Sequence, residues 1–167
     1  MLTARCLSLI TPDSERTMRT CLGAAACLET DSVNAGQFKG SQYVYLEGYL
    51  LFNQALTVAV LKAAKEAGCN VVLDLGSFEV VRAAREMLPK LLDDYVDIVI
   101  ANKDEAFAFS GTEDIAVSLE QLSDHCNISV IKLGKEGAWL KASGQPPVKV
   151  DAIMPDRVID STGAGDL

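Results

Sequence analysis

The segment from Val158 to Asp166 has the residue types that chemistry on a phosphate or an alcohol needs. It contains a Gly-x-Gly turn formed by Gly163, Ala164 and Gly165, followed directly by Asp166. Because glycine has no Cβ, the backbone of such a turn can approach a ligand closely, and its N–H groups can bind an anion. Asp166 can accept a proton from an alcohol. A plain glycine turn with a capping aspartate is the commoner explanation of Gly-x-Gly alone, so both interpretations stay open here.

The single histidine removes several other kinds of chemistry. His125 is the only histidine of the chain and follows what the pattern predicts to be a helix end, where a cationic ring is favourable. A zinc site made of several histidines is therefore excluded. No Gly-x-Ser-x-Gly sequence accompanies His125, which argues against a Ser-His-Asp or Cys-His nucleophile.

Composition bounds the class of protein. The chain has 167 residues, of which 49% are hydrophobic and 23% charged, as expected of one globular domain. Its net charge of -8 argues against nucleic acid as a partner. The longest uncharged run, Gly48 to Leu61, is too short for a membrane span. The start shows no secretory leader, and five cysteines without a C-x-x-C pair predict buried thiols in a reducing cytoplasm.

The elements that must position these residues alternate along the middle of the chain. Apolar strands are expected at 42–46, 70–75, 96–101 and 128–133. Helices are expected between them: one capped by Asn53 and ended by Gly68, one that begins after Ser77 and runs through Leu91, and two more before His125. Apolar strands separated by helices indicate a doubly wound α/β fold, with a mostly parallel sheet and helices on both faces.

The two ends differ from this pattern. Residues 1–40 contain one apolar stretch, a turn and a Gly/Ala-rich segment, which predict an edge or a flap. Residues 41–167 form the expected α/β core. Within it, Gly134 to Gly137 predicts a turn that joins two strands, and prolines break the remainder into extended pieces.

Three segments in the same order resemble motifs of the ribokinase-like, or PfkB-type, family of sugar and nucleoside kinases. Residues 160–166 resemble its D-T-x-G-A-G-D signature, with Ser161 in place of threonine. Residues 102–105, Asn-Lys-Asp-Glu, resemble its N-x-x-E motif, and residues 132–137 resemble its T/K-x-G-x-x-G strand and turn. Residues 11–18 and 47–50 resemble the adenosine-kinase-like branch. The resemblance covers essentially the whole chain and implies a ribokinase-like fold with residues 1–40 as part of a lid.

The resemblance also implies a role for each matching residue. Asp166 would be the catalytic base, and Gly163, Ala164 and Gly165 would form the anion hole for the transferred phosphoryl group. The positions that would bind the cofactors ATP and Mg²⁺ are Asn102 and Glu105, the latter through ordered water, together with Lys132, Gly134, Lys135 and Gly137 around ATP. Asp160 and Thr162 stand where family members often bind a monovalent cation such as K⁺.

Several of these residues have a structural alternative. Asn102 could cap a helix that begins at Lys103, with Glu105 favourable at the positive end of that helix. Lys132 could be a solvated charge at a strand end, and Asp160 could accept hydrogen bonds within its own turn. Asp74 lies in an apolar strand and must have partners if it is buried.

Two hypotheses from different classes follow. The chain is either the central part of an ATP-dependent kinase that phosphorylates a sugar or nucleoside hydroxyl, or a nucleotide-binding or regulatory module without catalysis. The resemblance places it in the middle of such a kinase, so we expect negligible activity from the 167 residues alone. Which small molecule it binds, and whether a second copy or a companion chain completes it, stay open.

Overall fold

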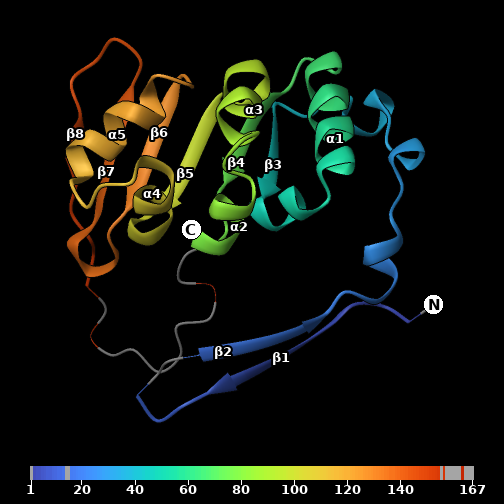
Figure 1. The fold of residues 1–167 in the computed structure, drawn as a ribbon, viewed down its shortest axis with the longest axis horizontal. Coiled ribbons are helices and arrows are strands. Elements are labelled where there is room, and N and C mark those ends of the chain that lie inside the picture. Colours follow the sequence, from blue (N-terminus) through green and yellow to red (C-terminus); the bar gives the residue numbers. More distant parts are fainter. Residues whose placement is uncertain (1, 14–15, 155, 157–162, 164–167) are drawn as a thin grey trace. The chain divides into compact units, whose positions relative to one another are not determined.

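The computed structural model describes residues 2–13, 16–154, 156 and 163. The chain forms two compact units, one made of residues 1–29 and 153–167 and the other of residues 30–152. Figure 1 shows the ribbon with its helices and strands labelled. Each unit is described below by itself.

The first unit contains a two-stranded antiparallel sheet. Strand β1 (Arg5–Ile10) pairs with β2 (Arg16–Cys21), and the 3₁₀-helix η1 (Gly23–Cys27) follows. The side chains of β1 are exposed along its whole length, as are nearly all of those of β2. The prediction that all cysteines are buried is wrong for Cys6, Cys21 and Cys27, which are exposed because they lie in this thin unit. Cys69 is buried and Cys126 half-buried, and burial raises the pKa of the Cys126 thiol to about 11.

The second unit is built on a six-stranded sheet, which confirms the predicted α/β class with a mostly parallel sheet. Its strands stand in the order β3-β4-β5-β6-β7-β8. They are β3 (Tyr43–Glu47), β4 (Asn70–Asp74), β5 (Ile98–Asn102), β6 (Ile128–Lys132), β7 (Ala138–Ala142) and β8 (Val148–Val150). The first four run parallel, and β7 and β8 are antiparallel additions. The turn between β6 and β7, η5 (Gly134–Glu136), is too short for the crossover that a parallel strand would need.

Helices connect the parallel strands. They are α1 (Gln54–Glu66), α2 (Phe78–Ala83), α3 (Leu88–Tyr95), α4 (Lys103–Ser110) and α5 (Ile115–Ser123), and the 3₁₀-helices η2 (Thr30–Ser32), η3 (Ala35–Phe38) and η4 (Gly48–Phe52) precede α1. The expected caps are present: the Asn53 side chain accepts from the N–H of Leu56, and the Ser77 hydroxyl accepts from the N–H of Val80.

The segment between β4 and β5 differs from the prediction. A single helix through Leu91 was expected, and the structure has two, with a turn over residues 84–87 between α2 and α3. Pro89 explains the break, because it lacks an N–H and its ring would clash with the carbonyl four residues earlier in a continuous helix. It stands in the first turn of α3, where proline is tolerated.

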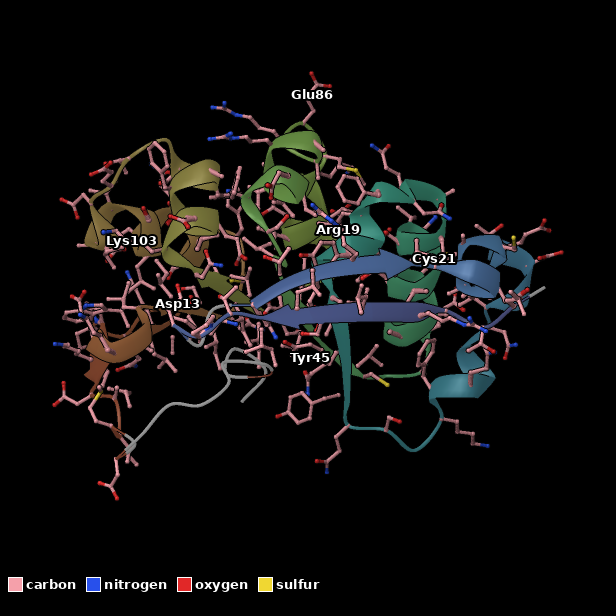
Figure 2. All side chains as sticks on the ribbon, turned by 90° about the horizontal axis from the view of Figure 1, so that it is seen from below. Asp13, Arg19, Cys21, Tyr45, Glu86 and Lys103 are labelled. Atoms are coloured by element: carbon pink, nitrogen blue, oxygen red, sulfur yellow. The ribbon has the colours of Figure 1, made fainter. Side chains whose placement is uncertain are left out.

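The five α-helices of the described residues lie on one face of the sheet (Figure 2). The parallel strands follow one another across the sheet in chain order. Right-handed crossovers between them therefore place every connecting helix on the same face. The sequence predicts helices on both faces of the sheet. Among the described residues, the helices cover one face. Alternate strand residues such as Leu46, Leu73, Val99 and Ile131 are buried on the helix side. None of the described helices has the length and apolar character that a membrane span requires.

Candidate active site

Three polar residues end three parallel strands at the same edge of the sheet. Asp74 is the last residue of β4, Asn102 of β5 and Lys132 of β6. Asn102 and Lys132 are paired in register, and Asp74 is paired with Ile100, two residues before Asn102. Paired residues share a face of the sheet, so all three stand on the face opposite the helices. The carboxyl edge of a parallel sheet is where α/β proteins bind ligands.

Lys132 reaches across β5 to Asp74. Its Nζ lies 2.8 Å from Oδ2 of Asp74, and the Tyr45 hydroxyl, from β3, donates to the same oxygen at 3.2 Å. Oδ1 of Asp74 accepts from the N–H of Gly76 at 3.0 Å. Asp74 is only 7% exposed, and these bonds supply the partners that its burial requires. Lys132 is therefore not simply a solvated strand-end charge.

Asn102 and Glu105 form a reciprocal cap at the start of α4. The Asn102 side-chain oxygen accepts from the N–H of Glu105 at 2.9 Å, and Oε2 of Glu105 accepts from the N–H of Asn102 at 2.8 Å. The Asn102 amide also donates to Oε1 of Glu105 at 2.7 Å. The capping alternative is thus present in the structure, and it fixes both side chains at the positive end of α4.

The Glu105 carboxyl is buried, with 2% of the residue exposed. Burial raises its pKa above the ordinary value of 4.5, because removal from water disfavours the charged form. The Asn102 N–H and the Lys132 charge lower the pKa, and the Asp74 and Asp104 charges raise it, so the net direction is upward. Asp74, Lys132 and Glu105 therefore belong to one electrostatic cluster.

This shift predicts a pH dependence of stability. Below the unfolded pKa of 4.5 both states of the chain hold the Glu105 proton, and burial of the neutral acid costs little. As the pH rises toward the folded pKa, the unfolded chain loses the proton first, so this contribution to stability is lost at up to about 1.4 kcal/mol per pH unit. Denaturant unfolding between about pH 4 and pH 7 should show the wild type losing stability relative to Glu105→Gln. A difference between the two proteins that does not change with pH would contradict this.

A pocket of about 340 Å³ lies beside these residues. It is lined by Asn102, Lys103, Asp104, Ile115, Lys132, Leu133, Gly134 and Glu136. The structure thus brings together three of the expected ATP-contacting residues, Asn102, Lys132 and Gly134. Glu105, Lys135 and Gly137 do not line the pocket, although each is next to residues that do. The volume is within the range of small-molecule sites, and the two lysines suit an anionic ligand.

Gly137 has a steric reason to be glycine. Its φ is +87°, and a Cβ at this position would overlap the carbonyl oxygen of Val150 on β8. A side chain would therefore push β8 away from the turn that ends at the pocket. Gly134, in contrast, has φ of +57° and nothing within 4 Å of a Cβ, so its site is open.

We expect Gly137→Ala to lower the free energy of unfolding by about 2 to 4 kcal/mol, from backbone strain plus overlap. Gly134→Ala is the matched control, because it meets no neighbour and should cost only about 1 kcal/mol. Chemical denaturation of both variants measures the difference. Equal losses in the two proteins would show that contact with Val150 is not what requires Gly137.

Most of the residues expected to act on the phosphoryl group lie outside the described part of the chain. These are the base Asp166, the anion-hole residues Ala164 and Gly165, and the cation positions Asp160 and Thr162. Gly163 is described, and it stands in a turn with φ of +78°, a conformation that favours glycine.

The donor set beside the pocket is of the kind that a magnesium nucleotide needs. The acidic residues Asp104 and Glu136 line it, and the carboxylate of Glu105 accepts a hydrogen bond from the lining residue Asn102. Oxygen donors of this kind suit Mg²⁺ held through its water shell. Among the residues that the structure describes, no three His, Cys, Asp or Glu side chains converge as a metal cage. The site therefore fits a magnesium ion that would arrive with the nucleotide.

Sequence reasoning did not find two members of the polar cluster. The sequence indicates only that Asp74 needs partners if it is buried, and that Tyr45 lies in the strand expected at 42–46. Figure 2 labels Tyr45 on β3, where its neighbours Val44 and Leu46 are buried and Tyr45 itself is half-exposed. The register of β3 with β4 brings its hydroxyl to Asp74, and that register is a tertiary property. Lys103 and Asp104 were the unassigned middle residues of the Asn-x-x-Glu motif.

Comparison with known proteins finds sugar and nucleoside kinases among the relatives of this chain. The family model described as "pfkB family carbohydrate kinase" matches residues 2–167. A ribokinase of Arabidopsis thaliana is 30% identical over 118 residues, which are 67% of this chain and 30% of the relative. The crystal structure of an adenosine kinase from Sinorhizobium meliloti superposes with a TM-score of 0.89 at 33% identity, over 98% of this chain and 51% of that one.

A structure of a ribokinase II from E. coli, in complex with ATP and Mg²⁺, shares the fold with a TM-score of 0.78 at 19% identity. It is covered over 53% of its length and 95% of this chain. The chain thus spans between about a third and about half the length of the relatives that it matches.

Proposed function

Because this chain belongs to the pfkB family of carbohydrate kinases, we propose that it carries the nucleotide-binding part of an enzyme that transfers a phosphoryl group from ATP to a hydroxyl of a sugar or nucleoside. The observation that carries the proposal is the pocket at the carboxyl edge of the sheet, where Lys132 and Asn102 meet the start of α4. The acceptor classes come from the named relatives, a ribokinase and an adenosine kinase.

The described residues can bind the phosphates of a nucleotide. Lys132 and Lys103 supply positive charge at the pocket, and the N-terminus of α4 adds the partial positive charge of its dipole. The turn from Gly134 to Glu136 offers backbone groups at the rim, and Lys135 in that turn is an exposed third cation. Gly137 maintains the turn through its contact with β8. Positioning and charge compensation are the main contributions that phosphoryl transfer requires from a protein.

Magnesium would accompany the nucleotide, where it shields the negative charge that the phosphates bring. Asp104 and Glu136 would hold its water shell from the pocket wall, and Glu105 would contribute from behind Asn102. The cap fixes the Glu105 carboxylate in one orientation, so no ordering cost arises when the ion arrives.

The catalytic steps fall to the last residues of the chain. Asp166 would accept the proton of the acceptor hydroxyl, and Gly163, Ala164 and Gly165 would bind the transferred phosphoryl group through their N–H groups. Asp160 and Thr162 would hold a monovalent cation such as K⁺. What supports these assignments is the match of residues 160–166 to the family signature. Residues 1–40 would contribute to a lid, and a cytoplasmic location would supply the nucleotide.

A non-catalytic nucleotide-binding module is the second candidate. The observation in its favour is that the pocket is formed by described residues, while the chain spans 51% of the length of the adenosine kinase structure that it matches. A second copy or a companion chain could then supply the acceptor side. For the 167 residues alone we expect nucleotide binding without appreciable turnover.

Calorimetric titration of the purified chain with MgATP tests the nucleotide assignment. We expect saturable binding at one site, weaker than that of a complete kinase, with adenosine alone binding more weakly because it lacks the phosphates that the lysines contact. Absence of both heat and thermal stabilisation at millimolar MgATP would refute a nucleotide role for these residues.

A further inference from the structure

The Asp74 carboxylate is a negative charge placed next to a site built for negative ligands. It is 7% exposed and accepts from Lys132 at 2.8 Å, from Tyr45 at 3.2 Å and from the N–H of Gly76 at 3.0 Å. The roles proposed above use Lys132 and leave Asp74 without one. A buried, ionised carboxylate is costly to maintain, so its presence at this edge calls for a physical account.

Lys132 belongs both to the pocket and to the ion pair with Asp74. The residue lines the pocket, its side chain is 27% exposed, and its Nζ is paired with Asp74 on the other side of β5. The ammonium carries one positive charge, and Asp74 already compensates it. A phosphate group that binds the Lys132 ammonium therefore shares its charge with the Asp74 carboxylate. The two anions repel each other, and water screens this repulsion poorly because Asp74 is buried.

We propose that Asp74 is a specificity-determining counter-ion of Lys132, with which the phosphates of a nucleotide compete for the ammonium. The inference rests on the proposed nucleotide site. By keeping a negative charge next to the phosphates, Asp74 lowers the affinity for the more highly charged nucleotides and favours their release. In the nucleotide-free protein, the Asp74 carboxylate is the anion paired with the Lys132 ammonium.

A purely positioning role for Asp74 predicts the opposite sign. If the carboxylate served only to hold Lys132 in place, its neutralisation would let the lysine move and would weaken nucleotide binding. The pairing of Lys132 with Asn102 in the sheet already fixes its backbone, and only the side chain remains to be ordered. Ordering the Lys132 side chain contributes a single free-energy term, whereas the Asp74 carboxylate repels every charge of the phosphates. We therefore expect the repulsion to have the larger effect on nucleotide affinity.

The test is Asp74→Asn, with MgATP, MgADP and AMP titrated into the full chain by calorimetry. Asparagine has the same shape, removes the negative charge and keeps an acceptor for the Gly76 N–H. Its amide group takes the place of Oδ2, which accepts from Lys132 and Tyr45 in the wild type. We expect MgATP to bind at least about tenfold more tightly than to the wild type, MgADP less so, and AMP least. In a Lys132→Met background the same substitution should have less than about a third of that effect on a logarithmic scale, because the shared cation is gone.

Two further variants keep the result interpretable. Tyr45→Phe removes the hydroxyl bond to Asp74 without changing any charge, and it should alter nucleotide affinity by less than about twofold. Asp74→Ser, also neutral, replaces Asp74→Asn if thermal unfolding shows that the latter does not fold. Nucleotide binding that weakens or stays unchanged in the neutral variant overturns the competition proposal while leaving the nucleotide site intact. Absence of binding in the wild type refutes the proposed function, and this inference with it.

Discussion

In the full-length gene product, we expect Asp166→Asn to lower the turnover number for phosphoryl transfer by about a thousandfold. A positioned general base contributes a rate factor in this range. Asparagine has the same size and cannot accept the proton of the acceptor hydroxyl. The base acts only as the hydroxyl is deprotonated, so the Michaelis constant for ATP should change little. Steady-state kinetics with a saturating acceptor measure both quantities.

The matched control for this prediction is Asp151→Asn. Asp151 is an exposed aspartate beyond β8, with 90% of its side chain accessible and only a loose contact to Lys149 at 3.7 Å. Its neutralisation removes the same charge and should leave turnover within about twofold of the wild type. Unchanged turnover in the Asp166 variant would remove the catalytic assignment, whatever the nucleotide affinity shows.

Lys132→Met is expected to weaken the binding of MgATP by about tenfold or more, since an ion pair or hydrogen bond to a charged group contributes about 1.5 to 3 kcal/mol. Methionine keeps the unbranched apolar stem and removes only the ammonium. Because Asp74 already compensates part of this charge, the loss should be larger in an Asp74→Asn background. Titration calorimetry gives the affinities.

Lys65→Met is the control for this second prediction. Lys65 is also paired with an aspartate at 2.8 Å, in this case Asp97, which precedes β5 and so lies at the amino ends of the strands. Each variant leaves one carboxylate without its lysine, so the two should lose comparable stability. Equal nucleotide affinities of the two variants would show that Lys132 does not contact the ligand.

Much of the fold could be predicted from the sequence because its signals are local. The apolar runs that became β4, β5 and β6 and the caps at Asn53 and Ser77 depend on residues close in the chain. The break between α2 and α3 is also local, because Pro89 marks the start of α3, but the apolar spacing alone predicts one helix through Leu91. The antiparallel strand β2 has no apolar periodicity, which is why it was not predicted.

The candidate site also combines contacts that the local sequence predicts with contacts that depend on the tertiary fold. Asn102 and Glu105 are three residues apart, and both the motif and the capping interpretation were visible in the sequence. The contact between Asp74 and Lys132 joins residues 58 positions apart and depends on the register of three strands, which no local pattern encodes. The hydrogen bond from Tyr45 to Asp74 depends on strand register in the same way.

This chain belongs to the pfkB family of carbohydrate kinases, and we propose for it ATP-dependent phosphoryl transfer to a hydroxyl of a sugar or nucleoside. The most direct test of this proposal is mass spectrometry of the products after the protein, as its gene encodes it, is incubated with MgATP and either ribose or adenosine. We expect a phosphorylated acceptor and an equal amount of ADP, and we expect neither product with the Asp166→Asn variant. ADP release without any phosphorylated acceptor, or the same product from both proteins, would contradict it.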